Sequence, residues 1–303
     1  MNMVSHASRP EVWDRIPSLF DGILPEYNLH GDVMAGYWKR LFAEFGAFQL
    51  ALIEGDDVLA VARSLPIPAF PAVSFPAVSP PAASPPTDSP PTDSFPSVSA
   101  SGAGPSVSPL ISISEAGASV SVDGGGDALP GIDDAIVAGF SGEAPTVLCA
   151  LGIEVAPAHQ GRRYAVTMLD ALRDLAASAG FGHLVAPLRP TWKERYPLTP
   201  ISRYAAWTTE TGEPFDPWLR KHVTLGGTLG TPAHRSSMIT GTVHEWETWT
   251  GMAFPESGSY VFPHGLAPLL IDRTADRGTY WEPCVWVSHP AGEPRLGRPV
   301  EER

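Results

Sequence analysis

Cysteine is scarce in this sequence, and its scarcity excludes two kinds of structure. The chain of 303 residues holds two cysteines, Cys149 and Cys284. A small fold stabilised by disulfides has more cysteines in a shorter chain. Neither cysteine has a second Cys or a His at the short spacing that is typical of a zinc site. We therefore expect two reduced, mostly buried thiols in a cytoplasmic protein without a metal centre.

Long hydrophobic runs are also missing. No segment reaches the roughly 18 consecutive apolar residues that a transmembrane helix needs. Residues 1–20 lack the apolar stretch of a signal peptide. The sequence therefore predicts a protein that neither spans nor crosses a membrane.

Basic residues are absent from a long central stretch. Residues 64–161 contain no Lys or Arg but hold nine Asp and Glu, in a chain whose net charge is −13. Binding to a nucleic-acid backbone depends on Lys and Arg side chains that neutralise phosphates. This charge distribution argues against nucleic acid as the main partner.

Proline is abundant, with 33 residues, and it concentrates in a repeat. Residues 70–99 read FPAVS, FPAVS, PPAAS, PPTDS, PPTDS and FPSVS, with Pro at the second and Ser at the fifth place of each unit. Such a density of proline removes backbone donors and prevents helices and central strands. We predict a disordered, partly polyproline II insertion over residues 66–128, between ordered parts at 1–65 and 129–303. A docking tract for a polyproline-binding partner stays open as the alternative, although its flanks lack basic residues.

The first ordered part shows two helices followed by a hairpin. Apolar residues recur at helical spacing over residues 10–20, and a second helix follows Asp32, which we expect to cap it. Residues 48–54 and 58–64 read as strands on either side of a turn at Gly55 and Asp56.

The second ordered part begins with a short helix over residues 132–140. A strand at 146–155, a helix at 164–179 that ends at Gly180, and a strand at 183–188 then follow. This order is typical of a βαβ-like unit.

The last ninety or so residues are rich in aromatic side chains, which either build a core or line an acceptor pocket. Residues 243–249, VHEWETW, alternate apolar and charged residues as a strand does, and residues 284–288 predict another strand after a loop at 251–258. The candidate polar groups of such a pocket are His244, Glu245, Glu247 and Glu256.

The turn at residues 155–165 carries the clearest chemical signal. It joins a strand to a helix, so its backbone N–H groups and the helix dipole attract an anion such as a pyrophosphate. Arg162 and Arg163 are the first basic residues after the long stretch without any. Small side chains around them let the backbone approach the anion closely.

This turn resembles motif A of the GNAT acyltransferases, in which Gln or Arg is followed by x-x-Gly-x-Gly/Ala. Gln160 matches the first place and Ala165 the last, whereas Arg163 stands where the family prefers glycine. The resemblance covers roughly residues 10–65 and 130–210. It implies an α+β fold of GNAT type, with a mixed central sheet between helices, and a site for acetyl-CoA or another acyl-CoA. The residues implied to bind that co-substrate are Ile153, Val155, Gln160, Gly161, Arg162, Arg163, Tyr164 and Ala165.

The resemblance also implies catalytic roles. Backbone N–H groups at residues 153–155 polarise the thioester carbonyl, and Glu154 is the expected base, with a solvated surface carboxylate as the alternative. Tyr204 or Tyr196 is the expected general acid, with a core aromatic as the alternative. Arg189 and Lys193 either meet the adenosine phosphate or are simply exposed.

The function that follows is transfer of an acyl group, most simply acetyl, from acyl-CoA to an amine of a small molecule or amino acid. A GNAT-like scaffold without this chemistry, or an enzyme with a carrier-protein or aminoacyl-tRNA donor, is the alternative. The sequence leaves the oligomeric state undecided, with a homodimer as one alternative. A V-shaped gap between the strands that hold Val155 and His183 would mark the acyl-CoA slot.

Overall fold

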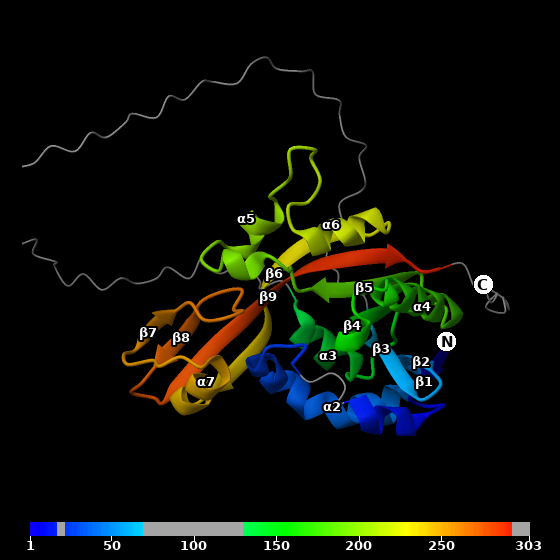
Figure 1. Ribbon diagram of the computed structural model, residues 1–303, viewed down its shortest axis with the longest axis horizontal. Helices are drawn as coiled ribbons and strands as arrows, with labels where there is room; N and C mark the ends of the chain where they lie inside the picture. Colours follow the sequence, from blue (N-terminus) through cyan, green and yellow to red (C-terminus); the bar gives the residue numbers. More distant parts are fainter. Residues whose placement is uncertain (17–21, 69–129, 293–303) are drawn as a thin grey trace, which may run out of the picture. The chain divides into compact units, whose positions relative to one another are not determined.

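A mixed sheet runs through the part of the chain that the structure, a computed structural model, describes: residues 1–16, 22–68 and 130–292 (Figure 1). All of these residues fall in one compact unit. The strands are β1 (Asn2–Ser5), β2 (Leu50–Glu54), β3 (Asp57–Ile67), β4 (Val147–Val155), β5 (His183–Leu188), β6 (Thr228–Gly241), β7 (Gly258–Tyr260), β8 (Leu269–Asp272) and β9 (Arg277–Pro290).

Helices cover the sheet on both faces, as predicted for this fold class. The α-helices are α2 (Asp32–Phe45), α3 (Ile132–Gly139), α4 (Tyr164–Ser178), α5 (Ile201–Ala205), α6 (Pro217–Thr224) and α7 (Val243–Thr250). Short 3₁₀ helices are η1 (Pro10–Arg15), η2 (Glu26–His30), η3 (Gly46–Phe48), η4 (Pro157–His159) and η5 (Lys193–Arg195). Among the helices that the structure describes, none is both long and apolar enough to span a bilayer.

The strands follow the order β1-β2-β3-β4-β5-β9-β8-β7, and β6 pairs with the other edge of β9. The pair β4–β5 is parallel, and the remaining pairs are antiparallel. One half of β9 pairs with β5 and the other half with β8, while β6 runs beside nearly its whole length. β9 therefore joins the part of the sheet built from β1–β5 to the part built from β7 and β8 (Figure 1).

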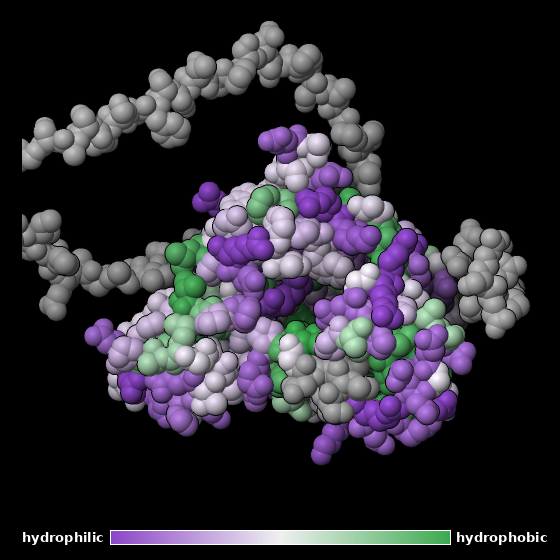
Figure 2. All heavy atoms as spheres, viewed as in Figure 1, coloured by the Kyte–Doolittle hydropathy of each residue, from purple (hydrophilic) through white to green (hydrophobic). Residues whose placement is uncertain are grey.

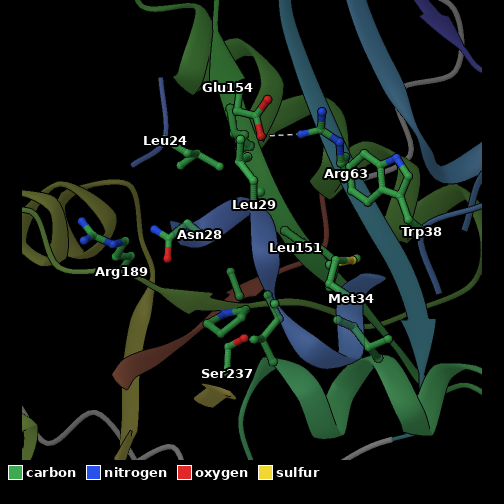
Figure 3. Close-up of a pocket in the computed structure, with 18 of the residues that line it drawn as sticks. Leu24, Asn28, Leu29, Met34, Trp38, Arg63, Leu151, Glu154, Arg189 and Ser237 are labelled. Carbon is green, nitrogen blue, oxygen red and sulfur yellow. Dashed lines mark hydrogen bonds and ion pairs between the residues drawn. The ribbon is translucent and has the colours of Figure 1, made fainter. Parts of the chain in front are cut away.

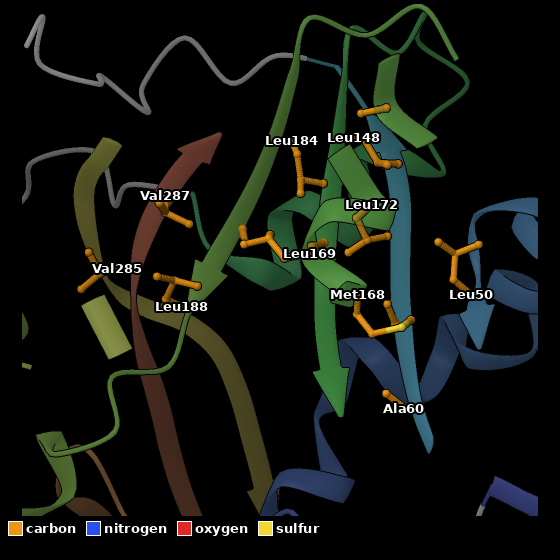
Figure 4. Close-up of a cluster of buried hydrophobic side chains, with 14 of the residues drawn as sticks. Leu50, Ala60, Leu148, Met168, Leu169, Leu172, Leu184, Leu188, Val285 and Val287 are labelled. Atoms are coloured by element: carbon orange, nitrogen blue, oxygen red, sulfur yellow. The ribbon is translucent and has the colours of Figure 1, made fainter. Parts of the chain in front are cut away.

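Helix α4 covers one face of the sheet because its apolar residues share one side. Met168, Leu169 and Leu172 are buried against Leu148 of β4 and Leu184 of β5 (Figure 4). The predicted helix over 164–179 is thus confirmed, and the chain leaves it through Gly180 at φ 83°, a conformation that favours glycine. Helices α2 and α3 cover the opposite face, where Leu41 and Ala135 pack with Cys149 and Cys284.

Both cysteines are free and buried, as predicted from their number.

Helix α2 confirms the predicted second helix, but Asp32 does not cap it. The N-cap is Gly31, and Asp32 lies in the first turn. Its carboxylate instead accepts hydrogen bonds from the backbone N–H and the hydroxyl of Thr240, at 2.9 and 2.8 Å. Asp32 therefore ties α2 to β6 instead of closing the end of its own helix.

The segment VHEWETW is a helix, so the predicted strand at 243–249 was wrong. Its start is fixed by a capping box in which Thr242 and Glu245 each satisfy the other's backbone N–H. Val243 and Trp246 are buried three residues apart, and the helix ends at Gly251 at φ 65°. In a segment of only seven residues, the alternation of apolar and charged side chains fits a strand as well as the three-residue spacing fits a helix, so the pattern alone did not identify the helix.

The predicted repeat at 70–99, its docking role and most of the insertion at 66–128 lie outside the described residues. The first predicted helix, at 10–20, is described only in part, where residues 10–15 form η1.

Candidate functional site

The parallel strands β4 and β5 pair only at their beginnings. Leu148 faces Leu184 and Cys149 faces Val185, and no later residue of β4 pairs with β5 in the described chain. The two strands therefore separate toward their carboxyl ends, at Val155 and Leu188. The predicted gap is present between these strands, although His183 lies at its closed end rather than at its mouth.

A β-bulge in β4 lies where the gap begins. On β3, Ser64 pairs with Ala150 and Arg63 with Gly152, which leaves Leu151 as an extra residue. The bulge shifts the alternation of the strand, so Ile153 packs with the α4 side of the sheet and Glu154 points to the α2 side. From Ala150 onward, the edge of β4 that faces β5 carries backbone groups that no strand uses.

A cavity of about 1290 Å³ occupies this region. On the α4 face it is lined by Leu169, Trp218 and His222, and on the α2 face by Met34 and Trp38 among others. Ile153 and Leu188 from the separated strands line it as well. Because one cavity touches residues of both faces, it passes through the sheet between β4 and β5. Figure 2 shows this side of the molecule hollowed near its centre, with hydrophobic side chains at the margin.

Glu154 lies in the cavity wall and forms an ion pair with Arg63 (Figure 3). The guanidinium of Arg63 also lies over the ring of Trp38, 5.0 Å from its centroid. The two partners are 15% and 11% exposed at their side chains. Arg63 and Trp38 thus hold the Glu154 carboxylate at a fixed place beside the gap.

Asp133 is a second carboxylate in the cavity wall, at the start of α3. Its Oδ2 accepts a hydrogen bond of 2.7 Å from the backbone N–H of Met238, whereas Oδ1 is buried without a hydrogen-bond partner among the described residues. Burial raises the pKa of Asp133 to about 6, against the opposing hydrogen bonds from Met238 and Ser237.

Arg189 and Glu282 form an ion pair at another part of the wall. Arg189 also donates to the hydroxyl of Tyr27 at 3.1 Å, and Tyr280 donates its hydroxyl proton to Glu282. Burial raises the pKa of Glu282, while the Arg189 guanidinium opposes that rise. This pair lies where β9 passes from β5 to β8.

The expectation that Lys193 is exposed or meets an adenosine phosphate was wrong, whereas Arg189 is half-buried in its ion pair with Glu282 and its contact with a phosphate stays a prediction. Lys193 is 1% exposed, and its ammonium donates to the carbonyl oxygens of Tyr196 and Leu266. Burial lowers the pKa of Lys193 to about 8. Arg189 faces the cavity, and Lys193 supports the chain beneath it.

Two histidines meet at the α4 side of the cavity. His222 Nδ1 lies 2.9 Å from Nε2 of His289, and His222 lines the cavity next to Trp218. Burial lowers the pKa of each imidazole to about 4. Both rings are therefore neutral at pH 7, and the hydrogen bond between them requires one ring to donate and the other to accept.

The predicted anion-binding turn holds two residues in the left-handed backbone conformation. Gly161 and Arg163 both have positive φ, 80° and 63°, and Arg163 is the N-cap of α4. Arg163 thus takes the left-handed conformation for which glycine is favoured, which is the place where the sequence departs from the motif. Arg162 and Arg163 are exposed, so the side chains are free to reach a ligand at the helix start.

The predicted general acids lie outside this cavity. Tyr204 is 1% exposed, and its hydroxyl donates to Asp216 at 2.8 Å. Tyr196 packs edge-on against Trp207, at 5.0 Å between ring centroids. Neither tyrosine is among the residues that line the cavity.

Other predicted pocket residues also lie elsewhere. Glu245 caps α7, and Glu247 accepts a hydrogen bond from the backbone of Phe254. His244 and Glu256 are exposed and do not line the cavity. The aromatic residues around Trp246 build a separate core under α7.

Several wall residues carried no recognisable signal in the sequence. Arg63, Asp133 and His222 come from segments far apart in the chain and meet only through the fold. Arg189 had one usable signal, because it directly follows β5. Parallel neighbouring strands end at the same edge of a sheet, so the residue after β5 lies near the end of β4.

The chain resembles proteins of known function or structure. No family model matches it. It is 39% identical to the arginine N-acetyltransferase avaD of Aspergillus versicolor over 164 residues, which are 48% of this chain and 57% of that protein. The chain thus matches little more than half the length of this relative. This likeness is to a protein named as an N-acetyltransferase, the kind of acyltransferase that the sequence motif resembles.

Two solved structures align over nearly the whole chain. The loading GNATL domain of CurA from Lyngbya majuscula has 13% identity and a TM-score of 0.49 over 96% of this chain and 97% of that one. The GphF GNAT-like decarboxylase in complex with isobutyryl-CoA has 12% identity and a TM-score of 0.49 over 96% of this chain and 100% of that one.

Proposed function

We propose that this chain is an N-acyltransferase that moves an acyl group, most simply acetyl, from acyl-CoA to an amine of an amino acid or other small molecule. The observation that carries the proposal is the cavity that passes through the sheet between β4 and β5. A donor that enters from the α4 face and an acceptor that enters from the α2 face would meet at the unpaired edge of β4.

The described residues fit an acyl-CoA on the α4 side. The turn at Gly161 and Arg163 directs backbone N–H groups outward at the start of a helix, where the dipole favours a pyrophosphate. Arg162 and Arg163 add two positive charges there. The free edge of β4 offers backbone N–H groups at residues 153–155 to the thioester carbonyl.

Glu154 is the proposed base for the acceptor amine. It lies on the α2 side of the gap, which is the acceptor side in this arrangement, and Arg63 fixes its carboxylate. The proton that leaves the amine is accepted by Glu154, directly or through a water molecule. Tyr204 and Tyr196 stay predictions for the general acid, without support from the shape of the cavity.

The acceptor proposed here is a cationic amino acid. The relative from Aspergillus versicolor is named for arginine. The cavity supports the same kind of molecule, because Asp133 lines it and no Lys or Arg of the described residues forms an ion pair with this carboxylate, whereas Glu154 and Glu282 are already paired. Carboxylates attract guanidinium and ammonium groups in a partly desolvated site.

The test combines binding and turnover. Calorimetric titration with acetyl-CoA should show binding, and arginine together with acetyl-CoA should release free CoA. Each arginine at the turn contributes about 1.5–3 kcal/mol to phosphate binding, so Arg162→Glu and Arg163→Glu should each weaken acetyl-CoA binding at least tenfold. Absence of any heat with acetyl-CoA and longer acyl-CoAs would overturn the proposal.

The alternative is a GNAT-like scaffold, or an enzyme with a carrier-protein or aminoacyl-tRNA donor. The observation in its favour is Arg163, whose Cβ narrows the turn where glycine would give the most room. Its test is Arg163→Gly. If the turn already accepts acyl-CoA, this variant should bind acyl-CoA more weakly, because it loses a positive charge. If the Cβ of Arg163 blocks the site, the variant should bind acyl-CoA more tightly.

Three further features belong to the same proposal. The two buried thiols, Cys149 and Cys284, support a reducing, cytoplasmic location. A homodimer and a polyproline-binding partner for residues 70–99 stay predictions from the sequence alone.

A further inference from the structure

The charged groups that line the inner part of the cavity fall into two kinds. Glu154 is paired with Arg63, and Glu282 is paired with Arg189. Asp133 differs from both, because no Lys or Arg of the described residues forms an ion pair with it. Asp133 is a partly buried carboxylate in the wall of a ligand-sized cavity, without a positive partner among the residues that the structure describes.

The hydrogen bonds of Asp133 leave one oxygen unused. Oδ2 is occupied by the backbone N–H of Met238, and Oδ1 is buried without a partner among the described residues. A buried carboxylate oxygen without a donor costs free energy, and such a group usually marks a place that water, an ion or a ligand completes. The neighbouring acidic groups, Asp134 and Asp32, make a positive ligand more favourable still.

Asp133 lies at a distance from the proposed base. Ser237, the neighbour of the Met238 whose backbone N–H donates to Asp133, and Glu154 lie at opposite ends of the lining drawn in Figure 3. Leu29 and Leu151 lie between them in that view. A ligand whose amine reacts beside Glu154 would therefore cross an apolar stretch before its other end reaches Asp133.

We propose that Asp133 binds the positively charged end of the acceptor. The chemical class is a dibasic molecule, with a reacting amine at one end and a guanidinium or ammonium group at the other, joined by a methylene chain. A rotation of the Asp133 side chain that turns Oδ1 into the cavity would let a guanidinium N–H donate to it, and the methylenes would contact Leu29 and Leu151. The inference rests on the proposed function, since it assigns the acceptor half of the same site.

The test compares arginine with citrulline, in which a neutral urea replaces the guanidinium at nearly the same shape. Wild type should prefer arginine. Asp133→Asn keeps the acceptor for Met238 and removes the charge. It should lower kcat/KM for arginine about 10–100-fold, mainly through KM, and change citrulline less than about threefold. Glu44→Gln, an exposed carboxylate on α2 that pairs with Arg40 and does not line the cavity, is the control and should leave both substrates unchanged.

Two results would overturn the inference. Equal losses for arginine and citrulline in Asp133→Asn would indicate a structural role, and an unchanged preference for arginine would place the cation elsewhere.

Calorimetric titration with arginine alone separates this inference from the proposed function. If wild type binds arginine, Asp133→Asn does not, and no acyl transfer occurs, the cation site stands and the transferase proposal fails. If acyl transfer to arginine proceeds equally in both proteins, the transferase proposal stands and the role of Asp133 fails.

Discussion

Glu154 is the residue on which the proposed chemistry depends most directly. General-base catalysis contributes about 10²–10⁴-fold in rate. Glu154→Gln keeps the shape of the side chain and removes the base, so kcat should fall by that order while acetyl-CoA affinity stays near its original value. Steady-state kinetics together with calorimetry measure both quantities.

The control for this variant is Glu44→Gln. Glu44 is exposed and pairs with Arg40 on α2, away from the cavity. It should leave kcat unchanged. Full turnover in Glu154→Gln would move the base to another group or to a chain of water molecules.

The site divides into residues that the sequence revealed and residues that only the fold reveals. Glu154 and the turn at Gly161 were found because they lie within a few positions of one another in a local motif. Asp133 and His222 were not, because α3 and α6 reach the cavity through long-range packing. For Tyr204 the sequence pointed to a residue that the fold does not bring to the cavity. Its position in the order of elements suits the general acid, but its hydroxyl donates a hydrogen bond to Asp216.

At the scale of single elements, the stability of α7 depends on its N-cap residue, Thr242. The Thr242 hydroxyl accepts a hydrogen bond from the backbone N–H of Glu245, and the Glu245 carboxylate accepts one from the backbone N–H of Thr242. Loss of an N-cap hydroxyl costs about 1 kcal/mol. Thr242→Ala should therefore lower the free energy of unfolding by about that amount in urea denaturation.

Thr248→Ala is the matched control within the same helix. Thr248 is exposed, and its hydroxyl bonds only to the carbonyl of His244. The free energy of unfolding should change by less than about 0.5 kcal/mol. Equal effects of the two substitutions would mean that the capping box does not stabilise the helix.

The capping box also explains which elements were predictable. Strands β2 to β5 and helices α2, α3 and α4 were predicted within a few residues, since their apolar periodicity agrees with their burial. Strands β1, β6, β7 and β8 were not predicted, and β9 begins at Arg277, well before the strand predicted at 284–288. The segment 243–249 failed because alternating apolar and charged residues fit period two as well as they fit a short helix. Thr242 and Glu245 carry the deciding signal, three residues apart.

The histidine pair links α6 to β9 and should make stability depend on pH. In the folded protein, burial keeps the pKa of His222 and His289 at about 4, below the ordinary value of 6.5. Between pH 6.5 and pH 4, the two histidines bind more protons in the unfolded chain than in the folded protein. The free energy of unfolding therefore falls as the pH is lowered through this range.

His289→Gln places an amide nitrogen where Nε2 was and removes one titrating ring. Between pH 7 and pH 4 it should lose about 1–3 kcal/mol less stability than wild type. Asp133 and Glu282 have raised pKa values and act in the opposite direction, but both proteins contain them, so they cancel in the comparison. Urea denaturation at several pH values gives the two curves, and parallel curves would contradict the assignment.

For the whole molecule, the repeat region should be dispensable for folding. Its composition cannot pack a core, and long surface loops cost little closure entropy. On either side of it the chain is anchored, since Leu65 and Ile67 of β3 pack in one cluster with Ala135 of α3. Replacing residues 70–125 by a short Gly-Ser linker should leave the melting temperature within a few degrees, and a large loss would mean that the region contributes to the fold.

The position of β9 has a consequence for how the protein is made. Among the described strands it is the last to leave the ribosome, yet it lies in the interior of the sheet between β5, β6 and β8. A nascent chain that ends before Arg277 has all the other strands but leaves β5, β6 and β8 with open edges. Synthesis at about 5–20 residues per second keeps these edges exposed for seconds, far longer than local helices take to form. We expect the growing polypeptide to be bound by chaperones that recognise extended segments, and to be released only when β9 docks.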